Sequence, residues 1–317
     1  MSSTTDIVDG ILRGDRRSIA RAISYVENGA PGAAEILRSV YANVGRAYRI
    51  GITGPPGAGK STLTNRLARL YRTSGKSVGI IAVDPTSPFT GGALLGDRIR
   101  MTDVETDDGV FIRSMASRGS LGGLSRKAKE AADILDAGRL DIILFETVGV
   151  GQSELDIAGA ADTTIVVLVP ESGDGIQAMK AGLMEIADFF VLNKSDRPGA
   201  DQAVMSIKMI LGFRPHDGGS WLPDVVKTRA GEGKGIDEVA AEIQRHRTHL
   251  ETTGRLQERR TDRVKRQIRE LVEEELQVVF WNDQRVKLLN DRLHGWSNGT
   301  STPFDIAHEL VGNFRRR

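Results

Sequence analysis

The chain has 317 residues, and its 43 Lys and Arg nearly balance its 42 Asp and Glu, which leaves a formal net charge of +1. This balance argues against a dedicated nucleic-acid binder, which usually carries a basic excess. Because the sequence has no Cys, disulfides, thiolate metal sites and cysteine nucleophiles are excluded. No apolar run is long enough to span a membrane, and the first nine residues lack the pattern of a secretory signal. We therefore expect a cytoplasmic protein with no membrane partner.

The N-terminal segment has the apolar spacing of short helices, with interruptions at Gly10, Gly14 and residues 28–31. We interpret residues 1–45 as a helical N-terminal extension.

Residues 46–250 follow a different pattern, in which short β-branched runs end in Gly or Asp and are followed by helical stretches. The seven runs are 48–53, 78–83, 110–112, 142–145, 164–169, 189–192 and 225–228. Continuous apolar strands that alternate with helices predict a mainly parallel sheet covered on both faces, which is a three-layer α/β fold. Ligands of such sheets bind beyond the carboxyl ends of the strands.

Residues 251–317 are expected to form a helical C-terminal extension. An apolar stripe that includes Ile268, Leu271, Val272 and Leu276 runs through a stretch rich in Arg, Glu and Gln. Such a stripe usually packs on its own domain. A long helical arm can also pair with a second copy of itself, so a homodimer is a further hypothesis.

The strand that ends at Thr53 is followed by a phosphate-binding loop. Its residues are Gly54, Pro55, Pro56, Gly57, Ala58, Gly59, Lys60 and Ser61, which match G-x-x-x-x-G-K-[ST] between a strand and a helix. Backbone N–H groups and the helix N-terminus favour phosphate oxygens. Lys60 is expected to reach the β- and γ-phosphates, Ser61 to ligate Mg²⁺ and Thr62 to lie near the α-phosphate.

A base-recognition motif, Asn193, Lys194, Ser195 and Asp196, follows the run 189–192. The Asp196 carboxylate can accept hydrogen bonds from guanine N1–H and from the 2-amino group, whereas adenine would leave the carboxylate unpaired. This indicates GTP in preference to ATP. The loop with Arg229 and Ala230 is a further candidate, through a backbone N–H donated to guanine O6.

Acidic residues near the expected phosphate site are candidates for holding Mg²⁺. Glu146 and Gly149 stand where many GTPases have Asp-x-x-Gly, and Asp84 and Asp97 are further acids. Val150 replaces the water-orienting Gln of Ras-like enzymes, so we predict slow intrinsic hydrolysis that depends on a partner or a rearrangement.

Two long motifs, residues 84–101 and 146–154, resemble the signature of the MeaB/ArgK family of P-loop GTPases. The family includes the human methylmalonic aciduria type A protein, and the similarity extends over nearly the whole chain. The resemblance implies a P-loop NTPase fold, a homodimer formed through a helical C-terminal arm, and GTP and Mg²⁺ as ligands. It also implies that the protein assists and protects an adenosylcobalamin-dependent acyl-CoA mutase by gating cofactor loading.

The resemblance also assigns roles to individual residues. It places Asp84, Asp97 and Glu146 in the regions that position Mg²⁺, and it makes Gln177 and Lys180 candidates for completing the GTPase site in a complex. Methylmalonyl-CoA mutase is the commonest partner in this family, but isobutyryl-, ethylmalonyl- and 2-hydroxyisobutyryl-CoA mutases have similar chaperones. Residues 171–176 and 228–230 depart from the usual family pattern, which leaves the choice of mutase open.

Two other functions fit the sequence less well. A metal-insertion GTPase usually carries clustered Cys and His, whereas this chain has five scattered His, of which His246 and His249 are expected on a solvated helical face. A kinase linked to amino-acid transport would need a catalytic base near the γ-phosphate, and the sequence offers no clear one.

Overall fold

The computed structural model describes residues 3–84, 106–116, 126–147, 153–171, 182–213 and 219–315. The chain divides into two compact units, Met1–Arg260 and Thr261–Arg317. The first unit includes the helices of the expected N-terminal extension. The boundaries proposed from the sequence, at residues 45 and 250, stay predictions.

A seven-stranded sheet forms the centre of the first unit, and all of its strands are parallel. The strands are β1 (Tyr48–Thr53), β2 (Val78–Asp84), β3 (Val110–Ala116), β4 (Ile142–Thr147), β5 (Thr163–Leu168), β6 (Phe189–Leu192) and β7 (Val225–Lys227). Their order is β3-β2-β4-β1-β5-β6-β7. All seven predicted runs are therefore strands, and the α/β prediction is confirmed. The central strand β1 lies where the direction of chain progression reverses, which is the usual ligand-binding point of such sheets.

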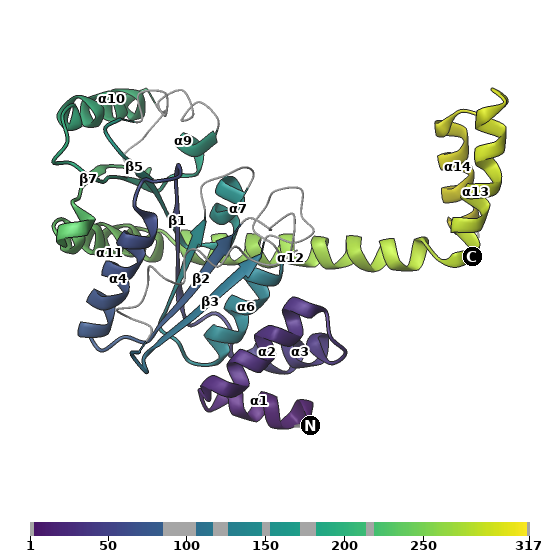
Figure 1. Ribbon diagram of the computed structural model, residues 1–317, viewed down its shortest axis with the longest axis horizontal. Helices are drawn as coiled ribbons and strands as arrows, with labels where there is room; N and C mark the ends of the chain where they lie inside the picture. Colours follow the sequence, from purple (N-terminus) through teal and green to yellow (C-terminus); the bar gives the residue numbers. More distant parts are fainter. Residues whose placement is uncertain are drawn as a thin grey trace. The chain divides into compact units, whose positions relative to one another are not determined.

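Helices cover both faces of the sheet (Figure 1). The helices of the first unit are α1 (Thr4–Leu12), α2 (Arg16–Asn28), α3 (Ala33–Val40), α4 (Lys60–Thr73), α6 (Arg126–Ala137), α7 (Ser153–Ala160), α9 (Met184–Ile186), α10 (Ala200–Gly212) and α11 (Ile236–Thr252), with short 3₁₀ turns η1 (Tyr41–Asn43) and η4 (Ala230–Glu232). Alternate strand residues face opposite layers. Ile80 and Leu144 pack towards α4 and α11, whereas Ile81 and Phe145 pack towards α6.

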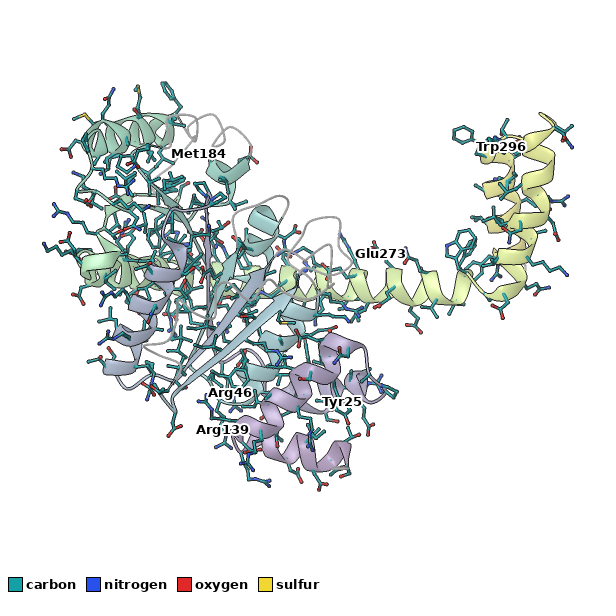
Figure 2. All side chains as sticks on the ribbon, in the orientation of Figure 1. Tyr25, Arg46, Arg139, Met184, Glu273 and Trp296 are labelled. Atoms are coloured by element: carbon teal, nitrogen blue, oxygen red, sulfur yellow. The ribbon has the colours of Figure 1, made fainter. Side chains whose placement is uncertain are left out.

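The N-terminal helices pack on α6 (Figures 1 and 2). Their boundaries follow from local hydrogen bonds: Ser3 and Asp6 form a capping box, and the Asp15 side chain caps α2. Arg113 of β3 forms an ion pair with Glu27 of α2. These helices therefore share one hydrophobic core with the sheet.

Ion pairs of buried carboxylates gather where the central strands begin. Arg49 of β1 bonds to Asp133 and Asp136 of α6 at 2.8 and 3.3 Å. Arg259, at the start of α12 (Arg255–Phe280), donates to both carboxylate oxygens of Asp188. Because a buried charge is costly without a partner, these pairs hold helices on both sides of the sheet in register with the strands.

His246 of α11 lies beside Asp188, among the ion pairs at the start of the strands. The expectation that it occupies a solvated face is wrong. Its side chain is 0% exposed, its Nδ1 lies 2.8 Å from Thr163 Oγ1, and its ring contacts Trp221 at a centroid distance of 4.7 Å. Burial lowers the pKa of His246 to about 4, although Nε2 lies 3.3 Å from Asp188 Oδ1. The positive charge of Arg259, which donates to the same carboxylate, also lowers the pKa of His246, so the imidazole stays neutral near pH 7.

The second unit consists of the rest of α12, α13 (Asp283–Ser297) and α14 (Pro303–Arg315). Arg285 stacks on Phe280 and Phe314 at 5.1 and 4.9 Å and donates to the Phe280 carbonyl oxygen. Trp296 projects from α13 (Figure 2). Exposed apolar side chains follow one another along α12: Ile268, Leu271, Val272, Leu276 and Val279. No helix in the described ranges has the length and apolarity of a membrane span.

Acid should weaken the first unit through His246. The pKa of His246 in the folded chain lies below its ordinary value of 6.5, so the unfolded chain binds the proton more tightly. The stabilisation is complete above pH 6.5 and is lost as the pH falls towards 4. We expect the free energy of unfolding to drop by about 2 kcal/mol more in the wild type than in His246→Asn between pH 7 and 4.5.

Urea unfolding at the two pH values measures this difference, because the variant removes only one of the groups that titrate in this range. His308→Asn, at an exposed position on α14, is the matched control. An equal loss of stability in wild type and His246→Asn would contradict the assignment.

Candidate nucleotide-binding site

The loop after β1 has a backbone that requires glycine. Gly54, Gly57 and Gly59 have φ values of 135°, 74° and 91°. A Cβ on Gly54 would lie 2.1 Å from the Val167 carbonyl oxygen, and one on Gly59 would lie 2.2 Å from Asn193 Nδ2. The glycines thus let the loop press against β5 and against Asn193. The loop leads into the N-terminus of α4, whose first N–H groups and helix dipole favour an anion.

The two polar residues at the start of α4 are oriented by the loop and by β4. Lys60 is buried, and its Nζ donates to the carbonyl oxygens of Gly54 and Pro55 at 2.8 and 3.0 Å. Ser61 Oγ donates to Glu146 Oε1. Glu146 stands near the carboxyl end of β4 beside Ile52 of β1, and its side chain is 3% exposed. The sheet therefore brings Glu146 to the start of α4, although it lies 85 positions after Ser61 in the sequence.

The chemistry of this donor set suits Mg²⁺. A hydroxyl and a carboxylate are hard oxygen ligands, and Mg²⁺ in nucleotide sites usually takes one or two protein oxygens together with phosphate oxygens and water. Within the described ranges no group of three or more acidic or His side chains is arranged to hold a metal by itself. Ser61 and Glu146 thus fit a shared metal site that a bound nucleotide would complete.

Asn193 connects the phosphate loop to a second loop after β7. Its Nδ2 donates to the Ala58 carbonyl oxygen at 2.8 Å. Its Oδ1 accepts from Thr228 Oγ1 and from the Ala230 N–H, both at 3.0 Å. A buried amide with all these bonds made holds the ends of β1, β6 and β7 at fixed separation.

The remaining residues of the base-recognition motif lie beside the phosphate loop. Lys194 has a positive φ of 55°, and its Nζ donates to the Gly57 carbonyl oxygen at 2.9 Å. Asp196 follows in an exposed turn, and Ser195 N donates to the Thr228 carbonyl oxygen at 3.0 Å. Asp196 is therefore exposed, two residues after Lys194, which bonds to the phosphate loop.

The loop after β7 is closed by its own hydrogen bonds. Arg229 and Lys234 pair across it, and the Arg229 side chain lies 3.8 Å from Glu232. Arg66 of α4 donates to the carbonyl oxygens of Ala230 and Gly231. No motif or charge cluster in the sequence marks Arg66 as a site residue.

Several predicted site residues are not placed by the structure. Asp97, Gly149, Gln177 and Lys180 lie outside the described residues. Asp84 is the last residue of β2, at the carboxyl edge of the sheet, and the structure describes its backbone but not its side chain. Pro55, Pro56 and Thr62 belong to the phosphate loop and the first turn of α4, and Thr62 is exposed there. The roles of all these residues stay predictions.

The chain is similar to solved and characterised proteins over most of its length. It superposes on the crystal structure of an LAO/AO transport system kinase with a TM-score of 0.75 and 29% sequence identity, covering 98% of this chain and 97% of the other. The fold prediction, a P-loop NTPase-like α/β fold, agrees with this similarity.

Sequence relatives cover a similar extent. The chain is 52% identical over 269 residues to a protein of Pyrococcus abyssi named as a GTPase, covering 84% of this chain and 83% of the relative. It is 36% identical to GTPase ArgK of Escherichia coli over 92% of this chain and 91% of the relative. It is 32% identical to a mitochondrial methylmalonic aciduria type A homolog of Caenorhabditis elegans, over 96% of this chain and 81% of the relative.

A family model described as methylmalonyl-CoA mutase-associated GTPase MeaB matches residues 19–285. This range contains the phosphate loop, Glu146, Asn193 and the loop after β7, so the match includes the described site. The chain therefore belongs to the MeaB family of GTPases.

Proposed function

We propose that this chain binds GTP with Mg²⁺ at the described site and hydrolyses it to GDP and phosphate. The observation that carries the proposal is the bonding of Asn193 to both the phosphate loop and the loop after β7, beside Ser61 and Glu146. Lys60 and the α4 N-terminus supply positive charge to the phosphates, and Asp196 selects guanine. Bound Mg²⁺ would neutralise charge that develops on the β- and γ-phosphate oxygens.

Hydrolysis by the chain alone is proposed to be slow. Val150 follows Gly149 in the sequence and cannot orient water as a Gln side chain does. Gln177 and Lys180 are proposed to complete the site when a partner binds. The function proposed is thus that of a switch, in which a partner controls the rate of turnover.

The proposed partner is an adenosylcobalamin-dependent acyl-CoA mutase, which the chain would assist and protect by gating cofactor loading. Two names support this choice: the matching family is described as associated with methylmalonyl-CoA mutase, and a relative is a methylmalonic aciduria type A homolog. Methylmalonyl-CoA mutase is therefore the first candidate, and isobutyryl- and 2-hydroxyisobutyryl-CoA mutases are the next.

A homodimer is proposed to form through the C-terminal extension. The supporting observation is the exposed apolar series along α12, since apolar side chains repeated on one helix are typical of helix pairing. The proposed location is the cytoplasm.

Replacing Lys60 with Ala should abolish tight binding of GTP. The ammonium group donates to carbonyl oxygens within the loop and is the charge available to the phosphates, so its removal costs charge-assisted hydrogen bonds. We expect the dissociation constant for GTP to rise about a hundredfold or more, measured by calorimetry. Lys76→Ala, an exposed residue after α4, is the control. Unchanged affinity in Lys60→Ala would contradict the phosphate site.

Replacing Asp196 with Asn should relax the choice of base. The amide cannot accept from both guanine N–H groups as the carboxylate does, so we expect the preference for GTP over ATP to fall about a hundredfold. Competition between the two nucleotides measures this ratio. Asp201→Asn removes an exposed carboxylate of α10 that forms an ion pair with Lys227 and should leave the ratio unchanged. A preserved preference in Asp196→Asn would show that guanine is recognised elsewhere.

The mutase partnership is tested by phosphate release from GTP with and without purified adenosylcobalamin-dependent acyl-CoA mutases. We expect slow turnover alone and an increase of at least about tenfold with one mutase, because a partner must complete the site. ATP in place of GTP is the control for specificity. Turnover that no mutase changes would contradict the partnership, and transfer of the γ-phosphate to a protein would instead favour a kinase.

A further inference from the structure

The helix α4 touches both ends of the proposed nucleotide site. Its first residue, Lys60, faces the phosphate loop. Arg66, less than two helical turns further along, donates from Nε to the Ala230 carbonyl oxygen at 3.1 Å and from Nη2 to the Gly231 carbonyl oxygen at 2.8 Å. One rigid helix thus contacts the loop for phosphate and the loop after β7.

The loop after β7 is held from two sides. On one side Asn193 accepts from Thr228 and from the Ala230 N–H. On the other side the half-buried Arg66 guanidinium donates to the two successive carbonyl oxygens. The planar fork of Arg suits two neighbouring acceptors, whereas a Lys ammonium acts as a single point charge. The pairing therefore fixes both the distance and the orientation of residues 230–231.

We infer that Arg66 is a positioning residue for guanine recognition: it holds the loop after β7 at the distance from the phosphate loop that a guanine nucleotide spans. The inference rests on the proposed GTP site and extends it to a residue outside the two motifs. Arg66 acts through the loop backbone, by its bonds to the carbonyl oxygens of Ala230 and Gly231. Its loss should weaken binding of guanine nucleotides and leave the phosphate loop intact.

Binding of GDP and of inorganic tripolyphosphate to the full chain separates these two effects, because tripolyphosphate has no base. For Arg66→Ala we expect the dissociation constant of GDP to rise about tenfold, the loss that hydrogen bonds to a charged group produce, with tripolyphosphate affinity unchanged. Arg66→Lys should be intermediate because it reaches one carbonyl oxygen at a time. Arg72→Ala is the matched control. Arg72 also lies on α4, but it pairs with Asp107 before β3, so this variant should bind GDP like the wild type.

Thermal melting of each variant without ligand shows whether it is folded, and Arg66→Lys serves if Arg66→Ala is not. GDP affinity within twofold of wild type in a folded Arg66 variant would overturn the inference, as would an equal loss of tripolyphosphate affinity. A wild-type chain that binds ADP as tightly as GDP would instead refute the proposed guanine site, and the inference with it. If Arg66→Ala keeps the wild-type preference for GDP over ADP, the inference is refuted but the proposed guanine site is not.

Discussion

The site depends on one buried side chain, the amide of Asn193. It donates to the Ala58 carbonyl oxygen and accepts from two groups of the loop after β7. An amide that makes all these bonds in a buried place has little freedom to rotate, and a carboxylate there could not donate to Ala58. This side chain therefore determines how the phosphate loop, the end of β6 and the loop after β7 are placed relative to one another.

The amide can do this only because glycine precedes Lys60. A side chain at position 59 would occupy the place of Asn193 Nδ2, and the backbone there has a φ of 91° that most residues avoid. Gly59 thus serves two purposes, a backbone turn with positive φ and close packing of Asn193. The site also depends on the strand order, because β4 lies next to β1 and this places Glu146 within hydrogen-bond distance of Ser61.

Much of this arrangement was predictable because it depends on local patterns. The phosphate loop and the strand runs are contiguous in sequence, and their spacing alone predicts a strand, a glycine turn and a helix. Arg66 was not predictable, because its role arises from a contact with residues more than 160 positions away. His246 was misassigned for the same reason: a helical face was judged solvated although Thr163, Asp188 and Trp221 cover it. Periodicity describes one element, whereas burial depends on what packs against it.

The ion pairs at the start of β5 and β6 connect the first turn of α12 to strands that end at the proposed nucleotide site. Asp162 and Asp188 immediately precede β5 and β6, and they bind Arg260 and Arg259 at the beginning of α12. Those two strands are four to six residues long and end at the nucleotide site. Every residue of both strands is buried, and a shift of one residue would exchange the faces of all their side chains, so their register is fixed. The first turn of α12 is therefore tied to the start of β6, the strand that ends at Asn193, and to the start of β5, whose last residue Leu168 accepts a hydrogen bond from the Asn193 N–H. A displacement of β6 would move both the start of α12 and Asn193.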